Sequence, residues 1–201
     1  MRKAFFQWVC VAVIGLTCLH SASATPPAQA STPEQAFVYQ VAGEVLSAVR
    51  AAPSQGNAKE TLEGVFSNYV DIEWVGQFVL GRHWKEANET QKQRFITSYR
   101  SFMVGGYTSR LRQYSGDDYT VSAPRNAGDG RYALTMKVKR AQGAPVVIDY
   151  KIRKNGSSYK IYDLVVEGIS LITTQRSEFD SVITRNGMDF LIDALAKKTA
   201  K

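Results

Sequence analysis

The first clear pattern along the chain is a helical repeat of apolar residues. Thr32 can cap the start of this helix, Pro33 suits its first position, and Gln35 can complete a capping box with Thr32. The stripe that follows has a spacing of four residues and consists of Phe37, Val41, Val45 and Val49. Because proline disrupts a helix interior, we expect the helix to end at Pro53.

Further helices are expected after a loop at residues 53–57. Two short ones are expected over residues 61–70 and 71–80, and a longer one begins near Asn88. The apolar stripe of the longer helix consists of Phe95, Tyr99, Met103, Tyr107 and Leu111. Gly105-Gly106 interrupts this stripe at a cost of about 1 kcal/mol for each glycine relative to alanine. The pair therefore predicts a bend or a close packing contact.

From Asp118 onward the period of the apolar positions changes to two. The alternating apolar residues are Tyr132, Leu134, Met136 and Val138, followed by Val146, Ile148, Tyr150 and Ile152. Asn155-Gly156 predicts a tight hairpin turn, and residues 159–166 form the last expected strand. One apolar and one polar face are typical of an antiparallel sheet that is covered on one side.

Two helices are expected to close the chain. Ser170 can cap the first, which should end at Asn186-Gly187, and the second is expected over residues 190–198. The order of helices, strands and helices predicts an α+β fold, with a curved antiparallel sheet of about four strands and helices packed on its apolar face.

The extreme N-terminus has the pattern of a secretory signal peptide. Arg2 and Lys3 precede an uncharged apolar stretch over residues 8–19, and Ala22-Ser23-Ala24 supplies the small residues of a cleavage site. An uncleaved anchor and a lipid-modified Cys18 fit the pattern less well. We expect residues 1–24 to be a signal peptide that is cleaved after Ala24, which places the mature protein in the periplasm.

Removal of this segment changes the composition of the chain. Cys10 and Cys18 are lost, so the mature protein has no thiol or disulfide chemistry. A linker over residues 25–32 should lead into a single domain over residues 33–201. The formal charge falls from +7 to +5, and a basic exported protein is a candidate partner for anionic head groups or an acidic surface rather than for nucleic acid. The mature chain contains no second apolar run of transmembrane length and is expected to be soluble.

Catalytic constellations are weak in this sequence. The stretch Gly168–Ile172 lacks the second glycine of a nucleophile elbow, so Ser170 is better explained as a helix cap. His83 has no second histidine or cysteine nearby, which predicts a structural or surface role and no metal site. Asp163 and Glu167 are the best remaining carboxylate pair, although a salt bridge with a basic neighbour is the simpler explanation. No catalytic residue and no cofactor is expected.

Aromatic residues are concentrated between Phe66 and Tyr114, a segment that holds ten of the nineteen found after residue 24. Helices packed over a one-sided, curved sheet form a cone. If side chains fill the cone completely, these residues form an ordinary core, and if they do not, an apolar ligand can occupy the remaining space. The composition of the chain is compatible with both.

Two separated stretches carry motifs that look like those of a known family. The first includes Val70-Asp71-Ile72, Val79-Leu80-Gly81-Arg82-His83-Trp84 and Gln91-Lys92-Gln93-Arg94-Phe95. The second includes Tyr159–Leu171, followed by Gln175-Arg176-Ser177-Glu178-Phe179. Together, at this separation, they resemble the MlaC/toluene-tolerance family over nearly all of residues 33–198.

The resemblance implies a periplasmic lipid carrier that holds acyl chains in a cavity between sheet and helices. It further implies transfer of lipid between an outer-membrane lipoprotein complex and an inner-membrane ABC transporter with an MCE-domain subunit, which maintains outer-membrane lipid asymmetry. Thr174-Gln175-Arg176 departs from the Asn-Tyr-Arg usual in phospholipid-shuttling members and is more similar to the hopanoid-associated branch. The implied cargo is therefore a phospholipid or a hopanoid-type lipid.

The apolar faces described above give a set of expected lipid-binding residues. They are Phe66, Tyr69, Val75, Phe78, Phe95, Tyr99, Phe102, Met103, Tyr107, Leu134, Met136, Ile148, Tyr150 and Leu164. Arg176 is expected to anchor the final helices through a carboxylate such as Asp71 or Glu167, with a head-group contact as the alternative role. Two other functions stay open: a non-lipid adaptor of an ABC transporter, and a cone-fold enzyme that uses Asp163 and Glu167.

Overall fold

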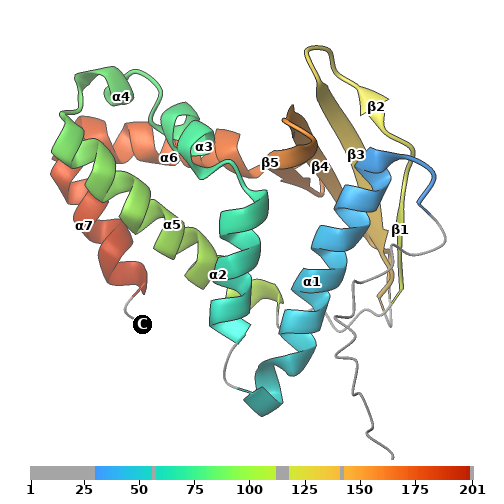
Figure 1. Cartoon of the computed structure of the whole chain (residues 1–201). Helices are drawn as coiled ribbons and strands as arrows, with labels where there is room; N and C mark the ends of the chain where they lie inside the picture. The colour runs from blue at the N-terminus through green and yellow to red at the C-terminus, as the bar shows by residue number, and fades with distance from the viewer. Residues whose placement is uncertain (1–29, 56–57, 112–117, 141–142, 200–201) are drawn as a thin grey trace, which may run out of the picture.

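An antiparallel sheet forms one side of the molecule, and most of the helices gather on the other side (Figure 1). The computed structural model describes residues 30–55, 58–111, 118–140 and 143–199, with side chains for residues 30–48, 60, 63–105, 118–140 and 143–198. The predicted signal peptide and the first part of the predicted linker lie outside the described residues. The predicted α+β class is confirmed.

The sheet has six strands rather than the expected four. They are β1 (Tyr119–Val121), β2 (Arg125–Asn126), β3 (Arg131–Val138), β4 (Val146–Asn155), β5 (Ser158–Val166) and β6 (Ile169–Ser170), in the order β1-β3-β4-β5-β6 with β2 also paired to β3. Strands β1, β2 and β6 contain only two or three residues each, which is too short for an alternating pattern to be read from the sequence. The three long strands are those that the sequence predicted.

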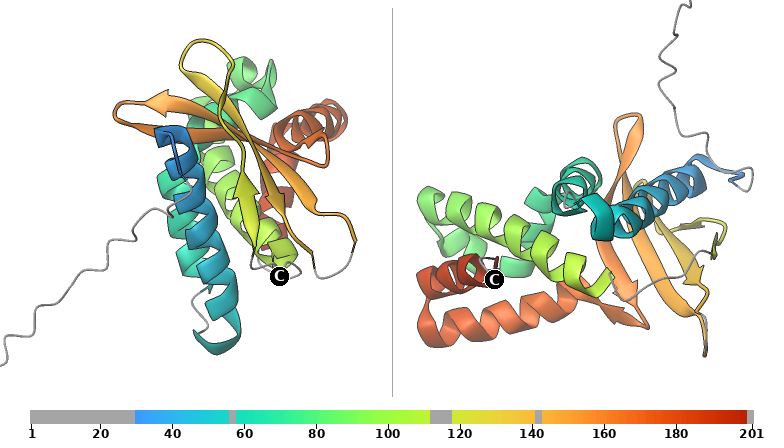
Figure 2. Two further views of the ribbon diagram at one scale, coloured as in Figure 1. Left: turned by 90° about the vertical axis from the view of Figure 1, so that its right-hand side faces the viewer. Right: turned by 90° about the horizontal axis from the view of Figure 1, so that it is seen from below.

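The register of the long strands brings the predicted inward residues onto one face. Leu134 lies opposite Tyr150, and Tyr150 lies opposite Leu164. Directly opposed residues of an antiparallel pair point to the same side. A bulge interrupts the pairing of β4 with β5, because Lys151 lies opposite Asp163 while Ile152 lies opposite Ile161. The sheet is strongly twisted, as Figure 2 shows.

Helix α1 (Pro33–Gln55) lies beside the sheet and is followed by α2 (Ala58–Tyr69) (Figure 1). The backbone amide of Gln35 donates to Thr32 Oγ1 at 3.2 Å, and Gln35 Oε1 accepts from the amide of Ser31 at 3.0 Å. The expected cap at Thr32 is therefore present, with the return bond made to Ser31 instead of Thr32. The helix ends two residues beyond Pro53, because proline removes a single backbone hydrogen bond and does not force an immediate end.

The remaining helices pack on one another. They are α3 (Ile72–Leu80), α4 (His83–Glu86), α5 (Glu89–Leu111), α6 (Leu171–Asn186) and α7 (Met188–Thr199). Ser170 Oγ accepts from the amide of Thr173 at 3.2 Å, so the predicted cap of α6 is confirmed. The close contact that was one of two predictions at Gly105-Gly106 is wrong for Gly105, because a Cβ there would meet no atom within 4 Å. Helix α5 continues through both glycines.

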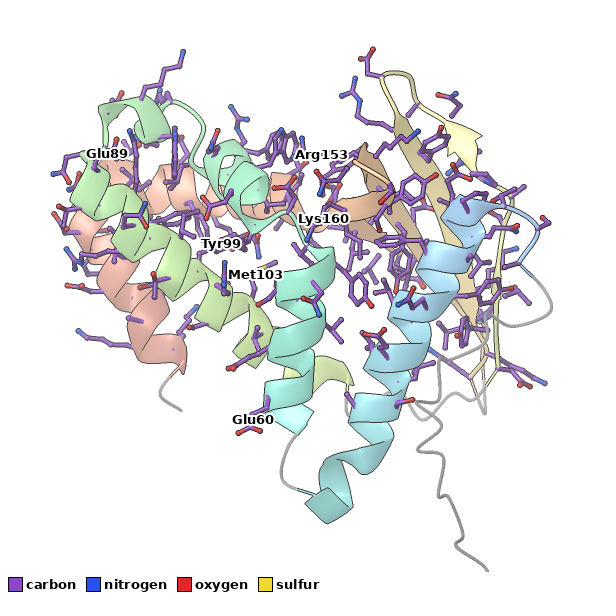
Figure 3. All side chains as sticks on the ribbon, viewed as in Figure 1. Glu60, Glu89, Tyr99, Met103, Arg153 and Lys160 are labelled. Carbon is purple, nitrogen blue, oxygen red and sulfur yellow. The ribbon has the colours of Figure 1, made fainter. Side chains whose placement is uncertain are left out.

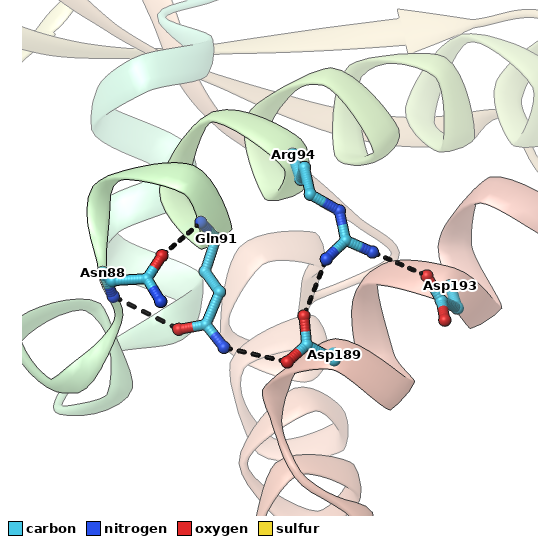
Figure 4. A network of polar contacts seen from close by, with 5 residues as sticks. All are labelled: Asn88, Gln91, Arg94, Asp189 and Asp193. Carbon is cyan, nitrogen blue, oxygen red and sulfur yellow. Dashed lines mark hydrogen bonds and ion pairs between the residues drawn. The ribbon is translucent and has the colours of Figure 1, made fainter.

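Polar contacts fasten α5 to α7 on the surface of the helical half (Figure 4). Arg94 Nη1 donates to Asp189 Oδ1 at 2.8 Å, and Arg94 Nη2 donates to Asp193 Oδ1 at 2.9 Å. Gln91 Nε2 donates to Asp189 Oδ2 at 3.0 Å, and Gln91 also forms a reciprocal cap with Asn88. These side chains are about half exposed, so each ion pair stabilises the fold only modestly.

The buried apolar residues form two clusters. The sheet cluster joins α1 to the inward residues of β3, β4 and β5, with Val38, Leu134 and Ile152 fully buried. The helical cluster joins α3, α5, α6 and α7, with Phe95 and Tyr99 stacked at a centroid distance of 5.3 Å. Helix α2 lies between the two halves in Figure 1.

Candidate apolar cavity

A cavity of about 290 Å³ lies where the sheet cluster meets the helical cluster. Helices α1, α2, α3, α5 and α6 line it together with strands β3, β4 and β5. Nearly all of its lining side chains are aliphatic or aromatic. In the described part of the chain, the space between helices and sheet is therefore not completely filled.

Eight of the fourteen residues expected to bind lipid line this cavity. They are Phe66, Tyr69, Val75, Met103, Met136, Ile148, Tyr150 and Leu164. Val75, Met103, Met136 and Tyr150 are buried, and the other four are half-buried. The alternation of the strands brought the sheet residues of this set together, because Met136 and Ile148 lie opposite each other in the register.

Four of the other expected residues lie in the helical cluster, away from the cavity. They are Phe78, Phe95, Tyr99 and Phe102. Phe95 and Tyr99 both meet the ring of Phe179 on α6 edge-on, at centroid distances of 6.1 and 5.8 Å. The stripe on α5 is divided because this helix extends beyond the sheet. Its start packs on α6. Among the stripe residues whose side chains are described, Met103 lines the cavity and lies one turn after Tyr99 (Figure 3).

The remaining two expected residues have different positions. Leu134 is completely buried in the sheet cluster and does not line the cavity. The side chain of Tyr107 lies outside the described residues, although its backbone belongs to α5.

Fifteen lining residues were not among those expected. They are Val41, Ala42, Val45 and Leu46 of α1, then Val65, Val70, Val104, Val138, Val146, Ile161, Tyr162, Asp163, Val166, Leu171 and Ile172. Val41 and Val45 belong to the apolar stripe of α1, and Val138 and Val146 continue the alternation of β3 and β4. The same periodicity that gave the strand residues could therefore have given these four. All four are valines, whereas most of the expected residues on the helices are aromatic.

The hydroxyl of Tyr69 is held at the outer rim of the cavity wall by polar partners. It donates to Glu44 Oε1 at 2.6 Å and accepts from Gln40 Nε2 at 2.9 Å. Burial, together with the hydrogen bond and negative charge of Glu44, raises the pKa of Tyr69 to about 12. The hydroxyl is thus protonated at neutral pH and ties α2 to α1.

Asp163 and Glu167 do not form a carboxylate pair. Asp163 is buried, and its Oδ2 accepts from Lys151 Nζ at 3.0 Å and from Ser170 Oγ at 2.8 Å. Glu167 is exposed, and its Oε1 accepts from the amide of Val147 at 2.8 Å. Asp163 therefore pairs with a basic neighbour, as the simpler explanation predicted, and the two carboxylates have separate partners.

Arg176 does not bond to the carboxylates that the sequence suggested. Asp71 is paired with Arg153, and Glu167 accepts from the backbone of β4. The guanidinium carbon of Arg176 lies 5.0 Å from the ring centre of Phe78, and the group packs against Gly81. Arg176 thus connects α6 to the end of α3 through a cation–π contact.

The sequence left a structural and a surface role open for His83, and the structure shows a buried, hydrogen-bonded side chain. It is buried between α4 and α6, with Nδ1 3.1 Å from Glu86 Oε2 and Nε2 2.9 Å from Asp180 Oδ1. The described residues contain no group of three or more histidine, cysteine, aspartate and glutamate side chains that could hold a metal ion. None of the described helices is both long and apolar enough to cross a membrane.

A twisted antiparallel sheet, helices on one side of it and an apolar cavity between them define an α+β domain that encloses apolar space. The family model described as MlaC protein matches residues 39–197, and the chain belongs to the MlaC family. The resemblance seen in the sequence motifs is thereby confirmed, whereas the hopanoid-associated branch stays a prediction.

Individual relatives cover almost the whole chain. The intermembrane phospholipid transport system binding protein MlaC of Haemophilus influenzae is 24% identical over 188 residues, which cover 88% of this chain and 87% of that protein. The toluene tolerance protein ttg2D of Pseudomonas putida is 27% identical over 195 residues, which cover 93% and 90%. The solved structure of a phospholipid-binding protein from Ralstonia solanacearum, in complex with a phospholipid, aligns with a TM-score of 0.72 at 24% identity. That alignment covers 84% of this chain and 98% of the other, and it shows that the two share a fold.

Proposed function

We propose that this chain is a periplasmic lipid-binding protein that carries a phospholipid with its acyl chains inside the cavity. The observation that carries the proposal is the apolar cavity between the sheet and helices α1, α2, α3, α5 and α6. The names of the Haemophilus influenzae relative and the Ralstonia solanacearum structure, which both refer to phospholipid, support this choice of cargo.

The physical need for such a cavity follows from the cost of exposing acyl chains to water. At about 0.8 kcal/mol per methylene, two chains of about sixteen carbons oppose transfer into water by roughly 20 kcal/mol. A carrier therefore has to cover the chains while the charged head group stays hydrated. This task requires apolar surface and no catalytic group.

The cavity must widen to hold two long chains. Its volume of about 290 Å³ is at the lower end of the range of roughly 300–1,000 Å³ that ligand pockets occupy. Met103 and Met136 line it, and methionine side chains change shape readily. We therefore expect the lipid-bound cavity to be larger than the one in this structure.

The proposed route of the protein follows from the sequence pattern and the family. Residues 1–24 direct export and are removed, so the mature protein begins at Thr25 in the periplasm. It carries lipid between an outer-membrane lipoprotein complex and an inner-membrane ABC transporter with an MCE-domain subunit. This transfer maintains the lipid asymmetry of the outer membrane. A hopanoid-type lipid is the second possible cargo, because Thr174-Gln175-Arg176 is similar to the hopanoid-associated branch.

The other two functions receive less support. A non-lipid adaptor needs no unfilled apolar space, yet this chain has a cavity lined by both clusters. An enzyme that used Asp163 and Glu167 would need the two groups to converge on one substrate. Each of them is instead bonded to a different part of the sheet.

Uptake of lipid from vesicles tests the proposal. Delipidated mature protein is mixed with vesicles of phosphatidylethanolamine and phosphatidylglycerol, separated from them by centrifugation, and assayed for organic phosphate. We expect about one phospholipid per protein molecule. Protein that returns free of phosphate, while its circular dichroism shows it folded, contradicts the carrier proposal and leaves the adaptor as the better account.

A further inference from the structure

Strand β4 contributes one aromatic residue, Tyr150, to the cavity wall. Its side chain is 7% exposed, and it lies opposite Leu134 on β3 and Leu164 on β5. The two neighbouring inward residues beyond it, Leu134 and Ile152, are completely buried and do not line the cavity. Along β4, Tyr150 is therefore the last residue that lines the cavity before the packed sheet cluster begins.

The hydroxyl of Tyr150 has no hydrogen-bond partner among the residues that the structure describes. In the same described set, every fully buried side-chain oxygen or nitrogen does have a partner. The Tyr150 oxygen must therefore keep some contact with open space. Tyr150 is more than nine-tenths buried, and the open space that it lines is the cavity.

The other two tyrosines that line the cavity, Tyr69 and Tyr162, are only half-buried. Tyr69 also lines the cavity, but its hydroxyl is bonded to Glu44 and Gln40. Tyr159, which lies on β5 opposite Lys154, donates to Glu34 Oε1 at 2.6 Å. Tyr150 thus presents a polar group to the interior of an otherwise apolar cavity.

The Tyr150 hydroxyl is neutral and can act as both donor and acceptor. Burial, with the nearby Tyr119 hydroxyl as a smaller contribution, raises the pKa of Tyr150 far above neutral pH. A neutral phenol does not attract a charged head group. It pairs best with a neutral oxygen, such as a carbonyl or a hydroxyl.

We propose that the Tyr150 hydroxyl is a hydrogen-bonding site inside the cavity, which selects lipids that carry a neutral oxygen within their apolar part over lipids that present only hydrocarbon there. The oxygen can come from the ester carbonyl of an acyl chain or from a hydroxyl on the chain. This inference rests on the proposed function, because it names a feature of the lipid that the cavity accepts.

The selectivity has a definite physical origin. A ligand that offers only hydrocarbon covers the hydroxyl without satisfying it, and a polar group that is buried without a partner loses the hydrogen bond it made with water. A single neutral hydrogen bond changes affinity by about three- to ten-fold. The expected effect is therefore a modest but measurable preference.

Three phosphatidylglycerols with identical chain lengths test the proposal: a diester, a diether, and a diester with a hydroxyl in the middle of one chain. Dissociation constants are measured for the wild-type protein, for Tyr150→Phe and for Tyr159→Phe. The last variant also removes a hydroxyl from the sheet, but from a residue that does not line the cavity. The diester-to-diether ratio reports on the carbonyl, and the hydroxylated-to-plain ratio reports on a chain hydroxyl.

We expect the wild-type protein and Tyr159→Phe to show at least one of these two preferences, by about three- to ten-fold. Tyr150→Phe should lose that preference while its affinity for the diether lipid is unchanged or improved. Wild-type protein that binds all three lipids equally overturns the inference without the need for any variant, and so does a preference that survives in Tyr150→Phe. Binding of none of the three lipids by wild-type protein contradicts the proposed function instead, so the two failures are distinguishable.

Discussion

Ile148 and Leu134 point to the same face of the sheet, but only Ile148 lines the cavity. We predict that Ile148→Trp places its ring in the cavity, so the protein stays folded and loses most of its bound lipid. Leu134→Trp forces the same ring into a filled core, which should lower the free energy of unfolding by about 1–3 kcal/mol. Urea unfolding and phosphate content of both purified variants measure the two effects.

The opposite result for this pair would contradict the assigned position of the cavity. If Ile148→Trp were as destabilised as Leu134→Trp, the space beside Ile148 would be filled in solution. If Ile148→Trp retained full lipid binding, the acyl chains would lie elsewhere.

Gly105 and Gly81 differ in what a side chain would meet. Gly105 lies inside α5 with no atom within 4 Å of an added Cβ, so Gly105→Ala should raise the free energy of unfolding by about 0.5–1 kcal/mol. Gly81 has a φ of +54°, and its Cβ would come within 2.9 Å of the Arg176 guanidinium. Gly81→Ala should therefore be destabilising. Thermal melts of the two variants measure both changes in stability. A loss of stability in Gly105→Ala would contradict the open surroundings found at that glycine.

Tyr159 and Glu34 give the molecule a pH-dependent contact. Burial alone would raise the pKa of Glu34, but the hydrogen bonds from Tyr159 and from backbone outweigh it and lower the pKa below 4.5. A carboxyl group whose pKa is lowered by folding adds stability above its unfolded pKa, and this contribution is lost as the pH falls through the folded pKa. Tyr159→Phe should therefore cost about 1–2 kcal/mol at pH 7 and much less at pH 3.

Unfolding titrations at the two pH values measure this difference, with Glu34→Gln as the control. Glu34→Gln removes the charge, so its stability should change less between pH 7 and pH 3 than that of the wild-type protein. An equal loss in Tyr159→Phe at both pH values would mean that the ionised form of Glu34 does not carry the contact.

At the residue scale, the sequence showed which side chains face inward but not which of them face empty space. Leu134 and Met136 have the same spacing, polarity and strand, yet one is packed and the other lines the cavity. The distinction depends on the summed volumes of side chains from several elements, which periodicity does not contain. The unpartnered hydroxyl of Tyr150 was hidden from sequence reasoning for the same reason.

The connections between elements differ in how deeply they are buried. Gln35 is buried, and its Nε2 donates to the carbonyls of Val121 at 3.3 Å and Ser122 at 3.2 Å, which fastens the start of α1 to β1. Arg94 joins α5 to α7 at the surface. We predict that Gln35→Ala lowers the free energy of unfolding by about 1–3 kcal/mol, because it leaves a buried carbonyl unpaired. Arg94→Ala should cost about 1 kcal/mol or less.

Chemical denaturation of the two variants under identical conditions tests this ranking. Adding salt should reduce the small effect of Arg94→Ala further and leave that of Gln35→Ala unchanged, because screening acts on exposed charges. A larger loss for Arg94→Ala than for Gln35→Ala would show that the surface network in Figure 4 stabilises the fold more than the buried connection does.

At the element scale, long periodic segments were predictable and short ones were not. The helix caps at Thr32 and Ser170 and the three long strands follow from side-chain types and alternation. Strands β1, β2 and β6 and the four-residue α4 carry too few residues for a period. Proline and glycine signals were overestimated at Pro53 and Gly105, because neighbouring helical residues outweigh the local preference at a single position.

At the scale of the whole molecule, the cavity depends on the arrangement of two cores. The sheet cluster and the helical cluster each bury their own apolar residues, and their lining side chains meet around the open space. Sequence motifs indicated the family, and the matched family model confirmed it. The location of the cavity between the clusters came only from the three-dimensional arrangement, since its lining combines residues as distant as Val41 and Ile172.

Native mass spectrometry of the exported protein, purified without detergent, tests the central claim most directly. The account predicts a polypeptide that begins at Thr25 and carries one non-covalently bound lipid, which collisional activation releases and fragmentation identifies as a phospholipid. Ile148→Trp purified in the same way should give the polypeptide mass alone. Wild-type protein that is folded, carries no lipid and acquires none from vesicles would contradict the account.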